Sequence, residues 1–178
     1  MSHLLKLSIF VIFLICGKSL FAEQQGVLDE NESEGQIEIE LNISELAQIS
    51  NLDDFYFDNW DKKSDMQKSD DVCVYSNGAG GRYNIIARGT GANGNFEVTD
   101  SVNSVPYEVY WNDDINKRDA GRRLRPNRSV RRSRASNEYF DCNGINNASL
   151  TIRFLKRDLA SALTSSYHGT LIVSVSPI

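Results

Sequence analysis

The sequence predicts an all-β protein, either a sandwich or a barrel. Short segments in which apolar and polar residues alternate are separated by turns rich in glycine, asparagine and aspartate. This arrangement is typical of both folds. No long stretch has the period of an amphipathic helix. Among residues 167–178, Leu171, Val173 and Val175 alternate with polar residues and so share one face of a strand. Whatever pairs with the free side of this final strand is expected to come from earlier in the chain or from another molecule.

The first 22 residues are expected to be a secretory signal peptide. Lys6 precedes an apolar run over residues 7–16, and Ala22 marks the expected cleavage position. The run is shorter than the ~20 apolar residues that span a bilayer as a helix. No second such run follows, so we expect an exported protein without an integral membrane span after cleavage.

Charge is distributed unevenly along the chain. Residues 23–71 hold 15 acidic and 3 basic side chains, a net charge of −12, whereas residues 72–178 hold 9 acidic and 14 basic side chains, a net charge of +5. Such asymmetry can steer like molecules to associate end to end, or it can simply keep the protein in solution. The segment 23–35 is acidic, polar and without aromatic residues, so we expect it to be flexible.

Residues 36–43 carry the most regular two-residue period in the sequence. Ile37, Ile39, Leu41 and Ile43 alternate with polar residues, which predicts a strand rather than a helix. This strand is either the first strand of a domain spanning residues 36–178 or a strand that is offered to another molecule.

Further strands are expected in chain order, separated by loops. The residues between 61 and 71 predict a charged loop, those between 112 and 137 predict a long basic loop, and residues 158–163 predict one helical turn. The expected strands cover residues 52–60, 72–75, 83–87, 96–98, 105–111, 139–142, 148–154 and 167–178.

Two cysteines remain after signal cleavage. In an exported protein Cys73 and Cys142 are expected to form a disulfide. The bridge would close a loop of about 70 residues and contribute ~4 kcal/mol in the chain-entropy model. Two free buried thiols are the less favoured alternative. His168 is the single histidine left, so we expect no metal site and no cofactor.

One glycine motif suggests a nucleotide site that its context excludes. Residues 89–94 match the dinucleotide-binding glycine pattern, which requires a helix to follow. Residues 95–98 instead predict a strand, so we interpret the motif as a glycine-rich hairpin.

An arginine-rich stretch lies within the predicted basic loop. Such a run can bind a polyanion, and a solvated loop is the simpler interpretation. Since aromatic residues do not interleave with the arginines and the protein is acidic, we expect no nucleic-acid partner. The candidate residues are Arg122, Arg123, Arg125, Arg128, Arg131 and Arg132.

No set of residues predicts catalysis. His168 falls within the terminal strand pattern and is expected to be an exposed strand residue. Tyr107 and Trp111 share one face of a predicted strand and are expected in the core. We therefore expect a protein that is not an enzyme.

The order of these segments resembles small exported subunits of chaperone–usher pili, close to the spore-coat-U-like pilins. The resemblance covers about residues 37–178, and its most specific parts are the block 106–112 and the ending 167–173. Its motifs are Leu52-Asp53-Asp54, Val72-Cys73-Val74-Tyr75-Ser76, Tyr83-Asn84-Ile85, Gly89, Gly91, Phe96, Pro106-Tyr107-Glu108-Val109-Tyr110-Trp111-Asn112, Cys142, Ala148-Ser149-Leu150 and Tyr167-His168-Gly169-Thr170-Leu171-Ile172-Val173.

The resemblance implies an immunoglobulin-like sandwich that lacks its last strand. A periplasmic chaperone strand would fill the gap first, and the N-terminal strand of a like subunit would fill it later, with an outer-membrane usher as a further partner. Residues 37, 39, 41 and 43 would then be the donor side chains, and Leu171, Val173 and Val175 the acceptor edge.

The sequence thus predicts a structural subunit of a fimbria-like surface assembly, polymerising by donor-strand exchange and contributing to adhesion or biofilm formation. The alternative is a free periplasmic or secreted binding module that recognises a polyanion or glycan through the arginine-rich stretch. Deletion of residues 23–43 separates the two, since only assembly requires that segment.

Overall fold

The computed structural model describes residues 25–116, 121–163 and 166–178. The expected signal peptide lies outside these ranges. The chain divides into two units, the first ending at Ile43 and the second, a compact unit, spanning Ser44–Ile178.

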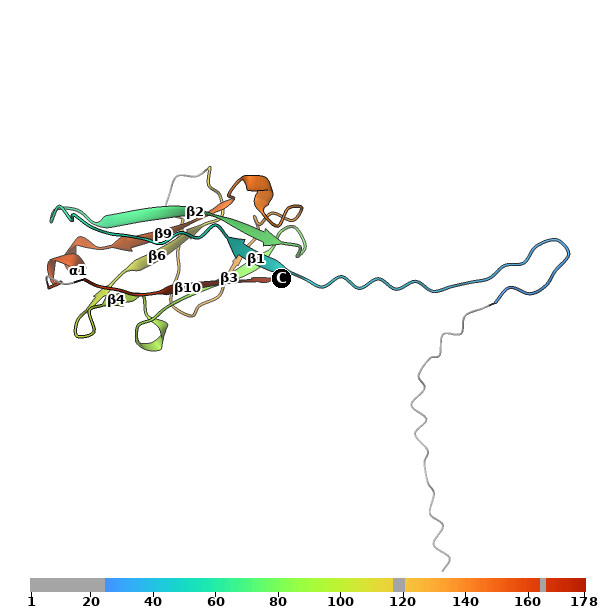
Figure 1. Ribbon diagram of the computed structural model, residues 1–178, viewed down its shortest axis with the longest axis horizontal. Coiled ribbons are helices and arrows are strands. Elements are labelled where there is room, and N and C mark those ends of the chain that lie inside the picture. Colours follow the sequence, from blue (N-terminus) through green and yellow to red (C-terminus); the bar gives the residue numbers. More distant parts are fainter. Residues whose placement is uncertain (1–24, 117–120, 164–165) are drawn as a thin grey trace, which may run out of the picture. The chain divides into compact units, whose positions relative to one another are not determined.

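The compact unit is built almost entirely from antiparallel strands (Figure 1). Its strands are β1 (Ala47–Ser50), β2 (Met66–Ser76), β3 (Tyr83–Gly89), β4 (Glu97–Thr99), β5 (Ser104–Pro106), β6 (Glu108–Asn112), β7 (Arg122–Arg123), β8 (Val130–Arg132), β9 (Ala148–Phe154) and β10 (Leu171–Pro177). Its helices are the 3-10 turns η1 (Ala92–Gly94) and η2 (Cys142–Gly144) and the five-residue helix α1 (Lys156–Ala160).

Two sheets form the two layers of a sandwich. One sheet has the strand order β1-β2-β9-β6-β7, and the other has the order β10-β3-β8. Figure 1 shows β2, β9 and β6 in one layer and β10 and β3 in the other. A small hairpin pairs β4 with β5. The fold is therefore all-β and immunoglobulin-like, as the sequence predicts.

The core lies between the sheets because alternate residues of each central strand are apolar. In β3, Tyr83, Ile85 and Ala87 are fully buried, and in β6, Val109 and Trp111 are fully buried. The Trp111 indole Nε1–H donates a hydrogen bond of 3.0 Å to the Tyr83 hydroxyl. This bond satisfies polar groups that would otherwise be costly to bury.

A disulfide joins Cys73 of β2 to Cys142 of η2. Both residues are buried. The bridge ties the loop before β9 to β2, the second strand of the five-stranded sheet. The pairing expected from the sequence is therefore present.

Two expected strands are wrong. Residues 52–60 form no strand, because Asn51 takes a positive φ of 63° and Asp53 N–H binds the Asp70 carboxylate instead of a neighbouring backbone. Residues 139–142 form a turn and the start of η2. There Cys142 and Asn143 have positive φ, and the Asp141 side chain accepts from Asn143 N–H.

Two expected loops are also partly wrong. The charged stretch 61–71 contains the first half of β2, which pairs with β9 from Met66 onward. The basic stretch 112–137 contains β7 and β8, and its Leu124 is only 2% exposed. Burial of Leu124 anchors the crossover between the two sheets, so the arginines are held on a fixed backbone.

The glycine motif forms a loop and not the expected hairpin, because β3 pairs with β10 and β8 while β4 pairs with β5. Residues 90–96 separate β3 from β4, and η1 lies within them. A side chain at Gly89 would collide with the Asn95 carbonyl oxygen. A short strand follows this motif, where a dinucleotide site needs a helix.

Candidate functional site

Strand β10 lies at the edge of its sheet. It pairs with β3 along its whole length, from Leu171 opposite Gly89 to Pro177 opposite Tyr83. Within the described part of the chain, no strand forms a ladder with its other side. One row of backbone N–H and C=O groups is therefore left for another strand.

The inward side chains of β10 are incompletely covered. Leu171, Val173 and Val175 pack against the core but remain half-buried, whereas Ala87 and Ile85 of β3, opposite the two valines, are 0% exposed. Outward-facing Ile172 is 39% exposed. Since apolar rows of this kind gain free energy when covered, the edge is suited to receive apolar side chains.

Strand β1 is the neighbour of β10 across the sandwich. Its backbone pairs with β2, not with β10, although the two strands lie close together. Ile49 of β1 is half-buried, and so are Phe55 and Phe57 in the segment that follows it. Phe57 contacts the Phe154 ring edge to face, with centroids 5.0 Å apart. More apolar surface is thus only partly covered in this region.

Both ends of the compact unit lie beside one turn. Asn77 accepts from Leu46 N–H through its side-chain oxygen, and its amide nitrogen donates to the Ser44 carbonyl. A Cβ added to neighbouring Gly78 would lie 2.7 Å from the Ile178 carbonyl oxygen. Asn77 therefore anchors the first residues of the compact unit.

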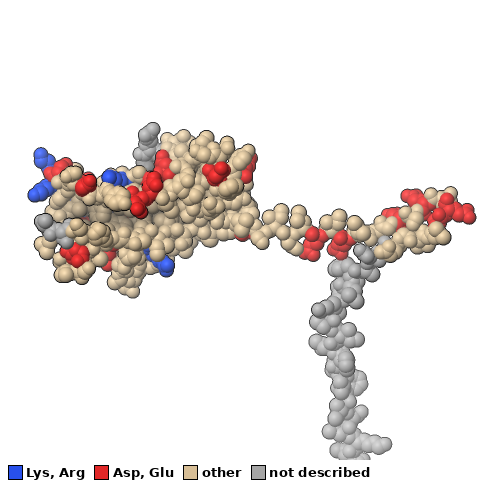
Figure 2. All heavy atoms as spheres, viewed as in Figure 1, with Lys and Arg blue, Asp and Glu red and all other residues tan. Residues whose placement is uncertain are grey.

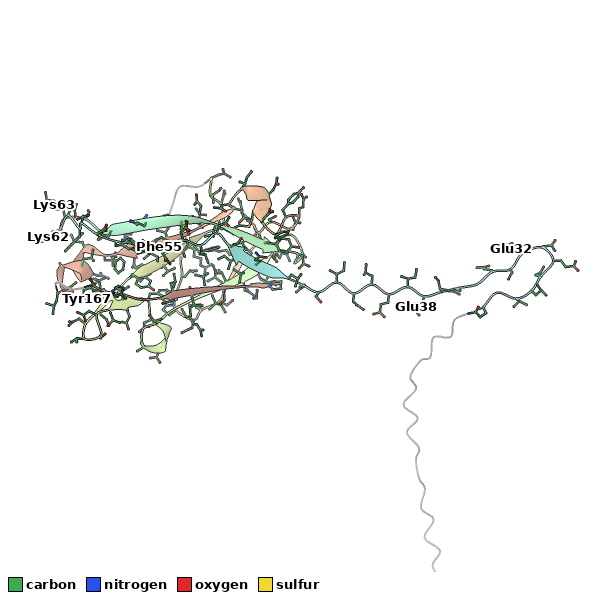
Figure 3. All side chains as sticks on the ribbon, in the orientation of Figure 1. Glu32, Glu38, Phe55, Lys62, Lys63 and Tyr167 are labelled. Atoms are coloured by element: carbon green, nitrogen blue, oxygen red, sulfur yellow. A yellow bond between two sulfur atoms is a disulfide. The ribbon has the colours of Figure 1, made fainter. Side chains whose placement is uncertain are left out.

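The alternating segment 36–43 lies outside the sheets. Residues 37–43 belong to no strand, and β1 is the first strand of the sandwich. The side chains of Ile37, Ile39, Leu41 and Ile43 are 69%, 82%, 80% and 75% exposed. Figure 3 shows side chains projecting to both sides of this extended segment, Glu38 among them. An unpaired strand pattern with four exposed apolar side chains is thus available for pairing.

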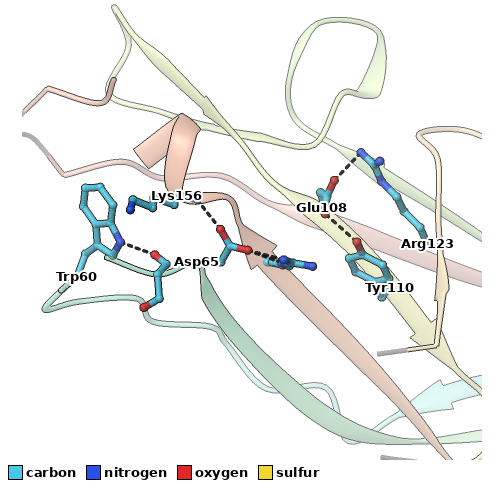
Figure 4. Close-up of polar contacts among 8 residues, drawn as sticks. Trp60, Asp65, Glu108, Tyr110, Arg123 and Lys156 are labelled. Atoms are coloured by element: carbon cyan, nitrogen blue, oxygen red, sulfur yellow. Dashed lines mark hydrogen bonds and ion pairs between the residues drawn. The ribbon is translucent and has the colours of Figure 1, made fainter. Parts of the chain in front are cut away.

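The candidate arginines do not form one cluster. Arg122 and Arg123 lie on β7, at the edge of the five-stranded sheet, and Arg123 forms an ion pair of 3.0 Å with Glu108 (Figure 4). Arg131 lies on β8 of the other sheet and is exposed. Arg132 is half-buried on the inward side of β8 opposite Tyr83, and its Nε is buried. Arg132 is thus poorly placed to bind a polyanion.

A second polar site joins the start of β2 to the end of β9. The Asp65 carboxylate accepts from Lys156 N–H at 2.7 Å and binds the Arg153 guanidinium (Figure 4). The Lys156 N–H, followed by Arg153, lowers the pKa of Asp65. Because Asp65 connects two strands and helix α1, we interpret it as structural.

Three features of this region were not predicted from the sequence. Ile49 lies in a strand that the sequence pattern did not indicate, Phe57 was assigned to a strand that does not form, and Asn77 was assigned only to a turn. The Asn-Gly pair at 77–78 signals a turn but not the contacts with residues 44 and 46. His168, by contrast, is exposed as expected, but it lies before β10 and forms only an isolated backbone bridge with Thr99. The strand expected over residues 167–178 therefore begins only at Leu171.

Comparisons with known proteins support the fold. No protein-family model and no curated protein matches the chain. A solved structure does match: a chain of a chaperone–tip adhesin complex from work on the activation of CFA/I fimbriae biogenesis. The TM-score is 0.51 and the sequence identity is 15%; the match covers 74% of this chain and 41% of that one. The chain therefore spans less than half the length of this neighbour, with which it shares an immunoglobulin-like fold.

No helix in the described ranges is both long and apolar enough to cross a bilayer.

Proposed function

We propose that the protein is a structural, non-enzymatic subunit of a fimbria-like surface assembly that polymerises by donor-strand exchange. The observation that carries the proposal is the open edge of β10, with its half-buried row Leu171, Val173 and Val175. The N-terminal segment of another copy supplies the missing strand. Assembly of such subunits contributes to adhesion or biofilm formation.

The donor and acceptor match in length and period. The β10 row offers apolar side chains at every second residue over seven residues, and segment 37–43 offers four at the same spacing. Strand addition forms main-chain bonds along the edge, while alternate side chains set the register. Burial of the four donor side chains would contribute ~6–12 kcal/mol gross.

The remaining partners follow from this role. A periplasmic chaperone holds the β10 edge before assembly, and an outer-membrane usher receives the subunit. The protein is therefore exported to the periplasm and then to the cell surface. Its fold neighbour comes from a chaperone–tip adhesin complex, which supports chaperone pairing.

The test is to fuse a copy of residues 36–43 to the C-terminus through a flexible linker and to measure melting temperature and solution mass. We expect the melting temperature to rise by more than about 10 °C and oligomers to be lost, because the fused strand occupies the β10 edge. The matched control carries the same linker and copy, with Ile37, Ile39, Leu41 and Ile43 of that copy changed to serine.

Equal melting temperatures for the fusion and its serine control would overturn donor-strand exchange. So would a stable monomer with and without the fusion. In either case the sandwich would already be complete.

A further inference from the structure

Four arginines line the outer face of the three-stranded sheet and its adjoining turn. Arg88 is an outward residue of β3, and Arg131 is the outward residue of β8, opposite Asn84. Arg125 and Arg128 lie in a turn closed by a hydrogen bond of 3.2 Å between Arg128 N–H and the Arg125 carbonyl. We call these four residues the arginine surface.

The turn is fastened to the sheet, so the four side chains belong to one region. Asn127 N–H donates to the Ala87 carbonyl at 2.9 Å, and the Asn127 amide donates to the Asn93 carbonyl at 2.7 Å. All four arginines are exposed. Among the described residues, no carboxylate forms an ion pair with any of them, whereas Arg123 and Arg134 are paired with Glu108 and Asp114. Within the described ranges, the arginine surface is thus a positive patch without a paired carboxylate.

An opposite charge of similar size lies in the N-terminal unit. Residues 25–43 contain six carboxylates and no basic residue, and Figure 2 shows the carboxylates along this segment without Lys or Arg beside them. Four of them, Asp29, Glu30, Glu32 and Glu34, precede the donor stretch. We call residues 29–34 the acidic segment.

The acidic segment is within reach of the arginine surface of a second copy. A strand added to β10 lies ~10 Å from β3, two strand spacings away, and ~14 Å from β8, three spacings away. Residue 34 precedes Ile37 by three residues and Asp29 precedes it by eight, which allows spans of up to ~10 Å and ~27 Å in an extended chain. Beyond Ile172, the outward side chains of β10 are the small Ser174 and Ser176, which leave the route across the C-terminal half of that strand open.

We propose that the arginine surface of one copy binds the acidic segment of the next copy, whose residues 37–43 occupy the β10 edge. This inference rests on the proposed donor-strand function and adds a second contact to it. The apolar row fixes the register, and the charge pairs speed encounter and favour a like subunit over other strands.

The test is a charge reversal and its rescue, with assembly of the purified protein followed by light scattering. We expect Arg128→Glu with Arg131→Glu to slow assembly about tenfold at low salt, with the difference shrinking as salt screens the charges. Reversing Glu32→Lys and Glu34→Lys in the same chain should restore the rate. Arg122→Glu with Lys63→Glu changes net charge equally, away from the arginine surface, and should have a smaller effect.

A further variant separates this inference from the function on which it rests. Ile39→Asp removes a donor side chain and leaves all arginines in place. One outcome is that wild type assembles, Ile39→Asp fails to assemble, and the arginine reversal has no effect on the rate. In that case the contact with the acidic segment is wrong, while strand exchange stands. If wild type and Ile39→Asp behave alike, both proposals fall.

The remaining outcome concerns a different ligand. If the arginine reversal slows assembly, the lysine reversal fails to rescue it, and retention on heparin is lost, then the arginine surface binds an external polyanion. That result would overturn the contact between copies.

Discussion

The two sheets of the sandwich end in very different ways. The five-stranded sheet ends in β1, with four residues, and β7, with two. The three-stranded sheet ends in β8, with three residues of which two are arginines, and in β10, with seven residues and no charge. Among the described strands, β10 is thus the long, apolar edge.

This difference indicates where a partner binds. Natural sheets protect their edges with short strands, charges or bends, because an open edge pairs with other chains. Three edges here follow that rule and β10 does not. An edge without such protection is a liability unless a strand covers it, which is why we place strand addition at β10.

The largest expected effect concerns the sheet with the short edges. Replacing Cys73 and Cys142 together by alanine should lower the free energy of unfolding by ~4 kcal/mol, because the bridge closes a long loop between residues 69 positions apart. Denaturant unfolding measures the loss. Wild type under reducing conditions is the control and should fall by a similar amount; an unchanged midpoint in both would contradict the role of the bridge.

The next largest effect is expected at the open edge of β10, where inward and outward side chains can be compared. Val173→Asp should remove roughly 2–3 kcal/mol of the stabilisation that a fused donor strand provides, because Val173 is in the row that the donor covers. Ser174→Asp is the matched control, since the exposed Ser174 points to the opposite face. The two variants are compared by the melting temperature gained on fusion, and equal gains would mean that the strand does not add at this row.

The sequence pattern predicts the contrast between the two sheets only in part. The alternation in residues 148–154 and in the β10 row was sufficient to place β9 and β10, because local periodicity reports directly on which face is buried. Residues 52–60 have the aromatic content of a strand, yet the positive φ at Asn51 and the bond from Asp53 N–H to Asp70 prevent a ladder. Such long-range capping leaves no local signal.

In the candidate site, too, the sequence predicts features that local periodicity sets and misses those that long-range contacts set. The sequence indicates both alternating segments, since each carries its own period. It does not separate Arg132, which turns inward, from the exposed Arg131, because their environment is set by pairing of β8 with β3. Nor does it show that Asn77 contacts residues 44 and 46, a contact made by residues about 30 positions apart.

The pH dependence of stability tests how well Tyr107 is shielded from water in the core between the sheets. Burial, followed by the charge of Glu97, raises the pKa of Tyr107 to about 12, above the ~10 of an exposed tyrosine. The neutral form is therefore favoured in the folded state, and its stabilisation is complete below pH ~10 and is lost as pH rises toward 12. Tyr107→Phe should show a weaker loss of stability between pH 10 and 12 than wild type. Equal pH dependence in the two proteins would show that Tyr107 does not report on the core.

The smallest effect concerns the contacts of Asp65, which join strands of the five-stranded sheet. We expect these contacts to take no part in strand addition at β10. Lys156 N–H and Arg153 lower the pKa of the half-buried Asp65 carboxyl, so its contribution is present above the unfolded pKa of ~4 and is lost as pH falls below it. Asp65→Asn should therefore lower the melting temperature slightly at pH 7 and not at pH 3. Because Asp65 serves only the fold, the gain from a fused donor strand should be the same in Asp65→Asn and wild type. A change in that gain would mean that the five-stranded sheet and the open edge are energetically coupled.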